Sequence, residues 1–298
     1  MYAMNELYDR VQAYRLSYDV YHPTYYSGTL LSATGGVPVV ATYHDLIHEK
    51  LSDKFPELAK EQNLIKQKAV LIGKANAIIA VSENTKKDLI EHYGVSEDKI
   101  SVVYLGNSFS ASVVNAGSPF PMPYLLFVGN RGLYKNFLPF LRAIFSLLLS
   151  RGIMLVCAGG RPFSQHEADE IKKMGVTDRV LYSDVNDDVL ATLYTNALAF
   201  VFPSLYEGFG IPILEAFSCN CTCILSNMGS LPEIAGDAAV YMDPYDEHSM
   251  YTAVISVVDD ELLRASLIVK GGERLKHFSW KKHVEETIEV YKKAVSKS

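Results

Sequence analysis

The sequence has 298 residues, of which 49% are hydrophobic and 21% are charged, and its formal net charge is −6. This composition is typical of a folded globular protein, and the length exceeds what one hydrophobic core organises, so we expect two domains. The acidic balance argues against nucleic-acid binding. The sequence contains no uninterrupted apolar run of about 18 residues, so it predicts no transmembrane helix.

The start of the chain and its cysteines bear on the cellular compartment. Residues 1–20 are acidic and rich in tyrosine, and they lack the basic region and apolar core of a signal peptide. We therefore expect a cytoplasmic protein, with the inner face of the plasma membrane as an alternative site of action. Cys219, Cys221 and Cys223 alternate, a spacing that is wrong for a zinc knuckle, and we expect buried, reduced thiols.

Short β-branched runs alternate with helical patterns in the first part of the chain. Strands are predicted at 18–24, 37–43, 75–82 and 100–106, with a helix at 84–94 that ends at Gly94. Residues 49–75 interleave lysines, acids and apolar residues, which indicates a solvated helix, with contact to anionic lipid as the alternative. Residues 107–123 are rich in Ser, Gly and Pro and predict a linker.

The same alternation restarts after the linker and continues through the second part of the chain. Strands are predicted at 124–130, 153–160, 179–184, 198–204 and 221–227, and helices at 136–152, 164–175, 186–197 and 280–296, with a further helix that begins at Ile211-Pro212. This order predicts an α/β fold with mostly parallel sheets, and the continuous apolar strands indicate burial on both faces.

Polar, glycine-containing loops follow the predicted strands of the second part, at the edge where open α/β sheets bind ligands. The first loop, "GNRGLYKN", places Arg131 and Lys135 in a turn where Gly129 and Gly132 let backbone N–H groups approach a ligand. With a helix N-terminus beside it, this loop indicates a pyrophosphate site. A solvated loop with two basic residues is the alternative.

Two further loops add candidate ligand contacts. Asp184 ends a strand, and the backbone around Val185 could bind a base, although capping of the next helix by Asp184 or Asn186 explains the same pattern. In "YEGFGIPILEAF", Glu207 and Glu215 flank two glycines, an arrangement that suits sugar hydroxyls. A glycoside-hydrolase pair and a helix-dipole role for Glu215 are the alternatives. The segment lacks the additional ligands that a metal site needs.

Three segments, in this order and at these separations, carry a family resemblance: "FVGNRGLYKN", "FVFPSLYEGFGIPILEAF" and "SNMGSLPEIAGDAAVYMDP". The sequence resembles the retaining GT-B glycosyltransferases of family 4, whose paired-glutamate signature corresponds to Glu207 and Glu215. The resemblance spans 18–296, and the variants "RGLYKN" and "YHDLIHE" look most like bacterial surface-polysaccharide transferases, often mannosyltransferases. It implies two Rossmann-like domains that face a cleft: a partial acceptor-side domain at 1–112, a nucleotide-sugar domain at 113–279, and a helix at 280–298 that packs back towards the first domain.

The resemblance also implies a role for individual residues. Arg131 and Lys135 would bind the donor diphosphate in place of a metal, so we expect neither a metal nor a cofactor. Glu207 would contact the transferred sugar and Glu215 the ribose. Further donor contacts are implied for Gly129, Gly160, Asp184, Val185, Gly208, Phe209, Gly210 and Ile211. His44 matches a histidine of the acceptor-side domain close to the reacting centre, with a strand-end histidine as the alternative.

The implied activity moves a hexose from a nucleoside-diphosphate sugar, with GDP-mannose favoured, to a glycan or lipid-linked acceptor. The departing phosphate would take the acceptor's proton. The chain departs from the family because it lacks the first strand and glycine-rich loop of the acceptor-side domain. A donor-binding remnant or subunit that needs a partner chain, and a GT-B-fold sugar-nucleotide epimerase, are therefore alternatives, and the oligomeric state stays open.

Overall fold

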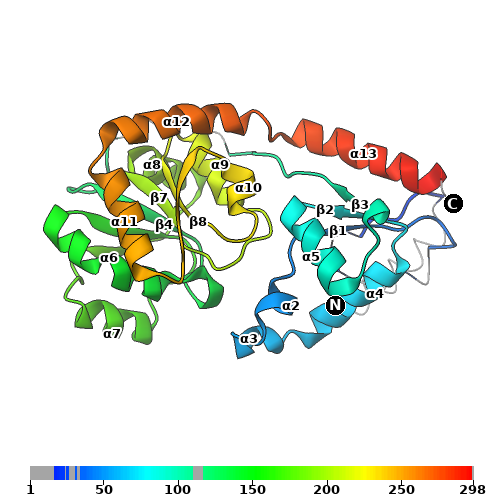
Figure 1. Cartoon of the computed structure of the whole chain (residues 1–298), viewed down its shortest axis with the longest axis horizontal. Coiled ribbons are helices and arrows are strands. Elements are labelled where there is room, and N and C mark those ends of the chain that lie inside the picture. Colours follow the sequence, from blue (N-terminus) through cyan, green and yellow to red (C-terminus); the bar gives the residue numbers. More distant parts are fainter. Residues whose placement is uncertain (1–16, 24, 27–30, 32–33, 110–116, 297–298) are drawn as a thin grey trace. The chain divides into compact units, whose positions relative to one another are not determined.

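The computed structural model describes residues 17–23, 25–26, 31, 34–109 and 117–296. The chain divides into two compact units (Figure 1): unit 1 is Met1–Gly106 with Trp280–Ser298, and unit 2 is Asn107–Ser279. The sequence-based boundary was placed at 112/113, inside a predicted linker that falls partly outside the described residues. Each unit contains one parallel sheet, so the predicted α/β class with parallel sheets is confirmed.

Unit 1 is a small three-layer structure. Its sheet has the order β1-β2-β3, with β1 (Val40–Tyr43), β2 (Ala77–Ala80) and β3 (Ile100–Val102) all parallel. Its helices are α2 (Ile47–Leu51), α3 (Pro56–Ala59), α4 (Gln62–Lys74), α5 (Glu83–Tyr93) and α13 (Trp280–Ser296), with a 3₁₀ turn η2 (Glu97–Lys99). The predicted end of the helix at Gly94 is confirmed, because that residue has φ 64° and caps α5.

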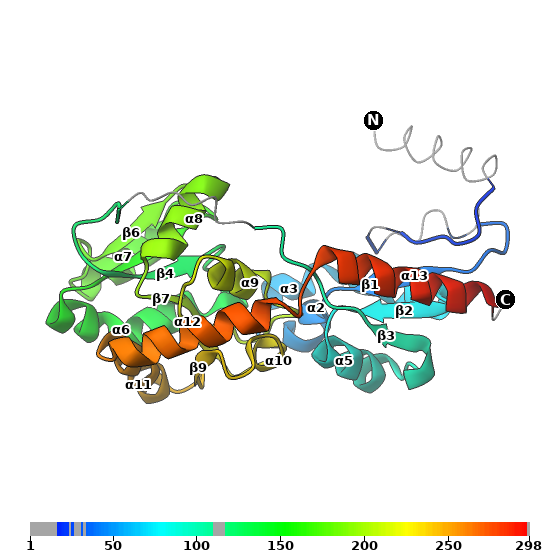
Figure 2. The same ribbon diagram turned by 90° about the horizontal axis from the view of Figure 1, so that it is seen from above.

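The last helix of the chain completes unit 1. Figure 2 shows α13 running along β1 and β2, the strands that it contacts. Val290 and Ala294 on α13 are buried against Val40, Ile79 and Val103 from the sheet. A second cluster on the same sheet gathers Leu71 of α4 and Leu89 of α5. Both faces of the sheet are therefore buried, as expected for parallel strands.

Unit 2 contains a larger parallel sheet with the strand order β6-β5-β4-β7-β8-β9. The strands are β4 (Tyr124–Val128), β5 (Met154–Ala158), β6 (Val180–Ser183), β7 (Ala199–Phe202), β8 (Cys223–Ser226) and β9 (Ala239–Met242). The order reverses between β4 and β7, because the chain builds outwards from β4 to β6 and then returns to the other side of β4. The connections after β4 and β7 therefore diverge, and this switch point at the carboxyl edge of the strands is where open α/β sheets bind ligands.

Helices cover both faces of the unit 2 sheet. They are α6 (Phe137–Arg151), α7 (Gln165–Lys173), α8 (Asp187–Asn196), α9 (Ile211–Ser218), α10 (Leu231–Ala235), α11 (Glu247–Val258) and α12 (Glu261–Leu275), with a 3₁₀ turn η3 (Leu133–Lys135). The main core packs Phe140 and Ile144 of α6 and Val254 of α11 against the sheet. Asn186 caps α8 by accepting a hydrogen bond from the backbone of Val189, as the sequence predicted.

The structure differs from the predicted elements in several places, among them β9, which was not predicted. In the described part of the strand predicted at 18–24, residues 18–23 form a single bridge, between Tyr21 and Val39. The helix predicted at 49–75 is three shorter helices, because Pro56 begins α3 and holds the preceding Phe55 in an extended conformation. The strand predicted from 221 begins at Cys223. Helices α10, α11 and α12 were not predicted.

Candidate active site

The loops after β4 and β7 meet at the topological switch point of unit 2. The backbone N–H of Leu205, after β7, donates to the carbonyl of Tyr134, after β4, at 2.7 Å. This bond ties the two predicted donor-binding loops together. Beside it, Lys135 and Glu207 come into contact, although 72 positions separate them in the sequence.

Lys135 and Glu207 form an ion pair at this switch point. The distance from Lys135 Nζ to Glu207 Oε1 is 2.7 Å, and the two side chains are 20% and 10% exposed. The rings of Tyr134 and Phe202 lie 5.1 and 5.2 Å from the ammonium group. Because water is largely excluded, solvent screens the two charges only weakly. Electrostatic interactions of the ammonium with an anion, and of the carboxylate with hydroxyl groups, are therefore stronger here than on an exposed surface.

The loop 207–210 packs against the loop that follows β8. The buried hydroxyl of Ser230 donates to the carbonyls of Glu207 and Phe209, at 3.0 Å each. A Cβ atom at Gly229 would lie 2.9 Å from the Glu207 carbonyl oxygen, so only glycine allows this approach. Sequence analysis missed both residues, although the quoted segment "SNMGSLPE" contained them.

Two glycines bring the loops after β4 and β5 into backbone contact. Gly129 and Gly160 have φ 95° and 71°, and a Cβ atom at Gly160 would lie 2.8 Å from the carbonyl oxygen of Gly129. A Cβ atom at the neighbouring Gly159 would lie 3.5 Å from the side chain of Val185. The predicted contacts Gly129, Gly160 and Val185 are therefore neighbours, with Asp184 accepting from the backbone N–H of Val185 at 3.1 Å.

Arg131 is buried in unit 2, where its partners are Glu167 of α7 and the loop after β5. Its side chain is 3% exposed and pairs with Glu167 at 2.9 Å. It also donates to the carbonyls of Arg161 and Pro162, and it lies over the ring of Phe163 at 4.7 Å. These contacts fix the turn after β5, so they support a structural role, and direct contact between Arg131 and a diphosphate stays a prediction.

The second glutamate, Glu215, lies one turn inside α9. Gly210, with φ 96°, precedes that helix, which begins at Ile211, and Pro212 occupies the first turn as predicted. Tyr194 donates to Glu215 Oε2 at 3.0 Å. Burial raises the pKa of Glu215, and the hydrogen bond from Tyr194 opposes that shift. Phe209 anchors the intervening loop by packing edge-on against Phe278 at 5.9 Å.

His44 belongs to unit 1, where it follows β1. Its backbone N–H donates to the hydroxyl of Tyr26 at 2.9 Å. Partial desolvation lowers the pKa of the His44 imidazole, the neighbouring Asp45 opposes that shift, and His283 and Lys68 reinforce it. The fully buried Lys68 donates to the Asp45 carbonyl at 2.9 Å and to Glu49 at 3.1 Å. This network holds the turn that carries the predicted acceptor-side histidine.

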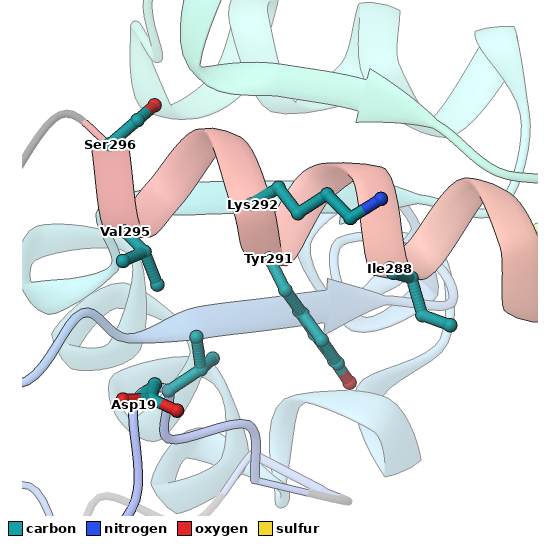
Figure 3. A pocket seen from close by; sticks show the side chains of 7 residues that line it. Asp19, Ile288, Tyr291, Lys292, Val295 and Ser296 are labelled. Carbon is teal, nitrogen blue, oxygen red and sulfur yellow. The ribbon is translucent and has the colours of Figure 1, made fainter.

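Unit 1 also has a groove of about 590 Å³ beside α13. Figure 3 shows its lining, which is formed by Asp19, Val20, Ile288, Tyr291, Lys292, Val295 and Ser296. The hydroxyl of Tyr291 bonds His22 Nδ1 at 2.7 Å, and Thr42 bonds the other ring nitrogen at 2.9 Å. The groove includes none of the predicted site residues.

Other sequence-based expectations concern cysteines, metals and membranes. All of the cysteines are buried thiols, as predicted, and burial raises the pKa of Cys221 and Cys223. In the described part of the chain, no group of His, Cys, Asp and Glu side chains has an arrangement that could hold a metal ion. Among the same residues, every helix is too short or too polar to span a bilayer.

The chain is similar to known glycosyltransferases in both of its parts. Residues 115–274 match the family "Glycosyl transferases group 1", and residues 2–107 match "Glycosyltransferase Family 4". An O-antigen chain mannosyltransferase B of Escherichia coli is 28% identical, over 85% of this chain and 70% of its own length.

Solved structures extend the comparison to the whole fold. Sucrose-phosphate synthase from Thermosynechococcus elongatus superimposes with a TM-score of 0.80 at 20% identity, covering 99% of this chain and 78% of its own. Anabaena HepE, solved with UDP and glucose, gives a TM-score of 0.77 at 16% identity, covering 95% and 80%. The predicted GT-B fold is confirmed over nearly the whole chain.

Proposed function

Because the chain belongs to the glycosyl transferases group 1, we propose that it is a retaining hexosyltransferase. It takes a hexose from a nucleoside-diphosphate sugar and passes it to a glycan or lipid-linked acceptor in surface-polysaccharide synthesis. The observation that carries this proposal is the Lys135–Glu207 pair at the switch point, 2.7 Å apart and mostly shielded from water. The E. coli mannosyltransferase relative supports mannose as the transferred hexose, and GDP-mannose is the donor that we favour.

The geometry supports a division of labour between the two charges. Cleavage of the sugar–phosphate bond puts negative charge on the departing diphosphate, and the fixed ammonium of Lys135 stabilises that charge. Glu207 orients Lys135 before the donor binds, and its second oxygen is directed to the sugar. Glu207 then positions the sugar and stabilises positive charge on its ring without attacking it.

The remaining donor contacts follow from the loops around this pair. The backbone of Gly208, Phe209 and Gly210 offers N–H groups to sugar hydroxyls, together with Ile211 at the start of α9. Glu215 takes the ribose. Gly129 borders the diphosphate, while Gly160, Asp184 and Val185 border the base. We assign Arg131 to the support of this cradle through Glu167.

The acceptor side of the proposal rests on unit 1. We assign His44, which follows β1, to the acceptor, and the acceptor's proton would leave with the donor phosphate. A second candidate is a donor-binding chain that transfers sugar only together with a partner chain. If the acceptor is lipid-linked, the enzyme acts at the inner face of the plasma membrane.

Calorimetric titration with GDP, UDP and ADP identifies the donor base first. The variants Lys135→Ala and Glu207→Ala are then compared for nucleoside-diphosphate affinity and for sugar transfer, with Lys173→Ala on the surface of α7 as the charge-matched control. We expect Lys135→Ala to weaken binding of the nucleoside diphosphate. We expect Glu207→Ala to reduce turnover far more than it reduces nucleotide affinity. Equal loss of both by Glu207→Ala contradicts the proposed role. Nucleotide binding without transfer or donor hydrolysis supports the second candidate.

A further inference from the structure

Tyr194 is a buried polar residue behind the candidate site, to which the proposed function assigns no task. It lies in the last turn of α8 and is fully buried. Its ring packs edge-on against Phe200 at 5.6 Å and Phe109 at 6.1 Å. An aromatic residue in such surroundings could be phenylalanine without loss of packing, so the hydroxyl needs a separate explanation.

The hydroxyl of Tyr194 bridges to the helix that carries the ribose-binding candidate. It lies 3.0 Å from Glu215 Oε2 and 3.4 Å from the carbonyl oxygen of Pro212. The carboxylate is the closer and the stronger acceptor. Among the described residues, the other carboxylate oxygen, Oε1, has no hydrogen-bond donor. One oxygen of Glu215 is therefore held and the other is available.

This contact also bears on the ionisation of Glu215. Burial raises the pKa of that carboxyl, and Asp187 raises it further, whereas the hydrogen bond from Tyr194 lowers it. An ionised carboxylate accepts hydrogen bonds from a diol more strongly than a neutral acid does. Tyr194 thus offsets part of the rise in the pKa of Glu215, in addition to holding one oxygen of the carboxylate.

We propose that Tyr194 is a positioning residue for nucleotide recognition, which fixes one oxygen of Glu215 so that the other meets the ribose hydroxyls of the donor. This inference rests on the proposed function, because it takes the ribose role of Glu215 as given. Tyr194 itself does not touch the ligand, and it acts only through Glu215.

The test compares a ribose with a deoxygenated sugar. The probe is the tightest-binding of GDP, UDP and ADP, measured by calorimetry beside its 2′,3′-dideoxy form. In the wild type we expect the dideoxy form to bind about tenfold or more weakly, as for loss of hydrogen bonds to a charged group. In Tyr194→Phe we expect this ratio to fall below about threefold, mainly through weaker binding of the ribose form.

A matched control separates positioning from loss of a buried hydroxyl. Tyr124 is also fully buried in unit 2, and its hydroxyl donates to the carbonyl of Leu193 at 2.7 Å. Tyr124→Phe should therefore lower the free energy of unfolding by a similar amount. It should keep the wild-type ratio between the affinities for the ribose and dideoxy forms. Glu215→Asp provides a second variant that keeps the charge but shortens the side chain, and it should lose the ratio as Tyr194→Phe does.

The possible outcomes separate the inference from the function on which it rests. A wild-type ratio that survives in Tyr194→Phe but is lost in Glu215→Asp overturns the positioning role of Tyr194 and leaves the proposed transferase intact. A wild-type ratio near one shows that Glu215 does not bind ribose, which overturns that part of the proposed function and the inference with it. In a Glu215→Ala background, Tyr194→Phe should change the affinity no further, and an additive loss overturns the coupling.

Discussion

Replacement of Gly229 by alanine offers a direct test of how the sugar-facing loop is held. The glycine has φ 61°, and a Cβ atom there would lie 2.9 Å from the carbonyl oxygen and 3.0 Å from the backbone nitrogen of Glu207. Both atoms belong to the main chain, so they cannot swing aside as the end of a flexible side chain would. The loop itself must move.

The size of this movement follows from ordinary contact distances. Carbon and oxygen atoms in contact lie roughly 3.5 Å apart, so the backbone of Glu207 must shift by about half an ångström. A left-handed backbone costs a non-glycine residue about 1–2 kcal/mol, and the overlap adds about 1–3 kcal/mol. Because Glu207 pairs with Lys135 at 2.7 Å, a shift of this size also disturbs the ion pair.

Gly152 supplies the matched control, since it has the same φ of 61° and no atom within 4 Å of its ideal Cβ position. We expect Gly152→Ala to lose only the backbone contribution to the free energy of unfolding, measured by urea denaturation. Gly229→Ala should lose more, and its sugar-transfer rate should fall about tenfold to a hundredfold with a smaller change in nucleotide affinity. Equal transfer rates in the two variants would refute the claim that Gly229 places Glu207.

Three further variants test the ion pairs and the buried acid. Lys68→Met leaves the acidic side chains of Asp45 and Glu49 without their buried cation. The free energy of unfolding, measured by denaturant titration, should therefore fall by about 3–5 kcal/mol. Lys86→Met is the control, because its partner Glu97 is exposed, and it should change the free energy of unfolding little. Arg131→Lys keeps the charge but not the fork geometry. Urea denaturation should show a loss of about 2 kcal/mol, with nucleotide affinity kept within about threefold; a much larger affinity loss would show direct diphosphate contact. Glu215 has a pKa above its unfolded value, so its ionisation destabilises the fold as pH rises from about 4.5 through the folded pKa. Glu215→Gln should therefore raise the melting temperature at pH 8 but not at pH 4, and an equal effect at both pH values would contradict this reasoning.

Local signals in the sequence were sufficient for much of the fold. Gly94 and Asn186 act at helix ends through contacts within four residues, so their positions could be predicted from the chain itself. The alternation of apolar strands and helices is also a local pattern, and it predicted the parallel sheets. The break at Pro56 was also local, but the lysine-rich pattern around it was interpreted as one continuous helix.

The candidate site depended more on contacts between distant segments. The role of Ser230 comes from its reach to Glu207, more than twenty positions earlier, and no local pattern shows which carbonyl a serine will meet. The direction of Arg131 is set by Glu167 and by the aromatic ring of Phe163, both supplied by a later part of the chain. Sequence spacing alone placed Arg131 beside Lys135 without showing that it turns inwards.

The return of α13 to unit 1 has a consequence for the order in which the protein folds during synthesis. Val103 and its partner Ala294 on α13 belong to one apolar cluster, so that cluster cannot form until all of unit 2 has been made. At roughly 5–20 residues per second, the ribosome needs about 10–40 s to cover this distance. During that time one face of the unit 1 sheet lacks its cover, and the apolar residues Val40, Ile79 and Val103 on that face are exposed to aggregation and to chaperones.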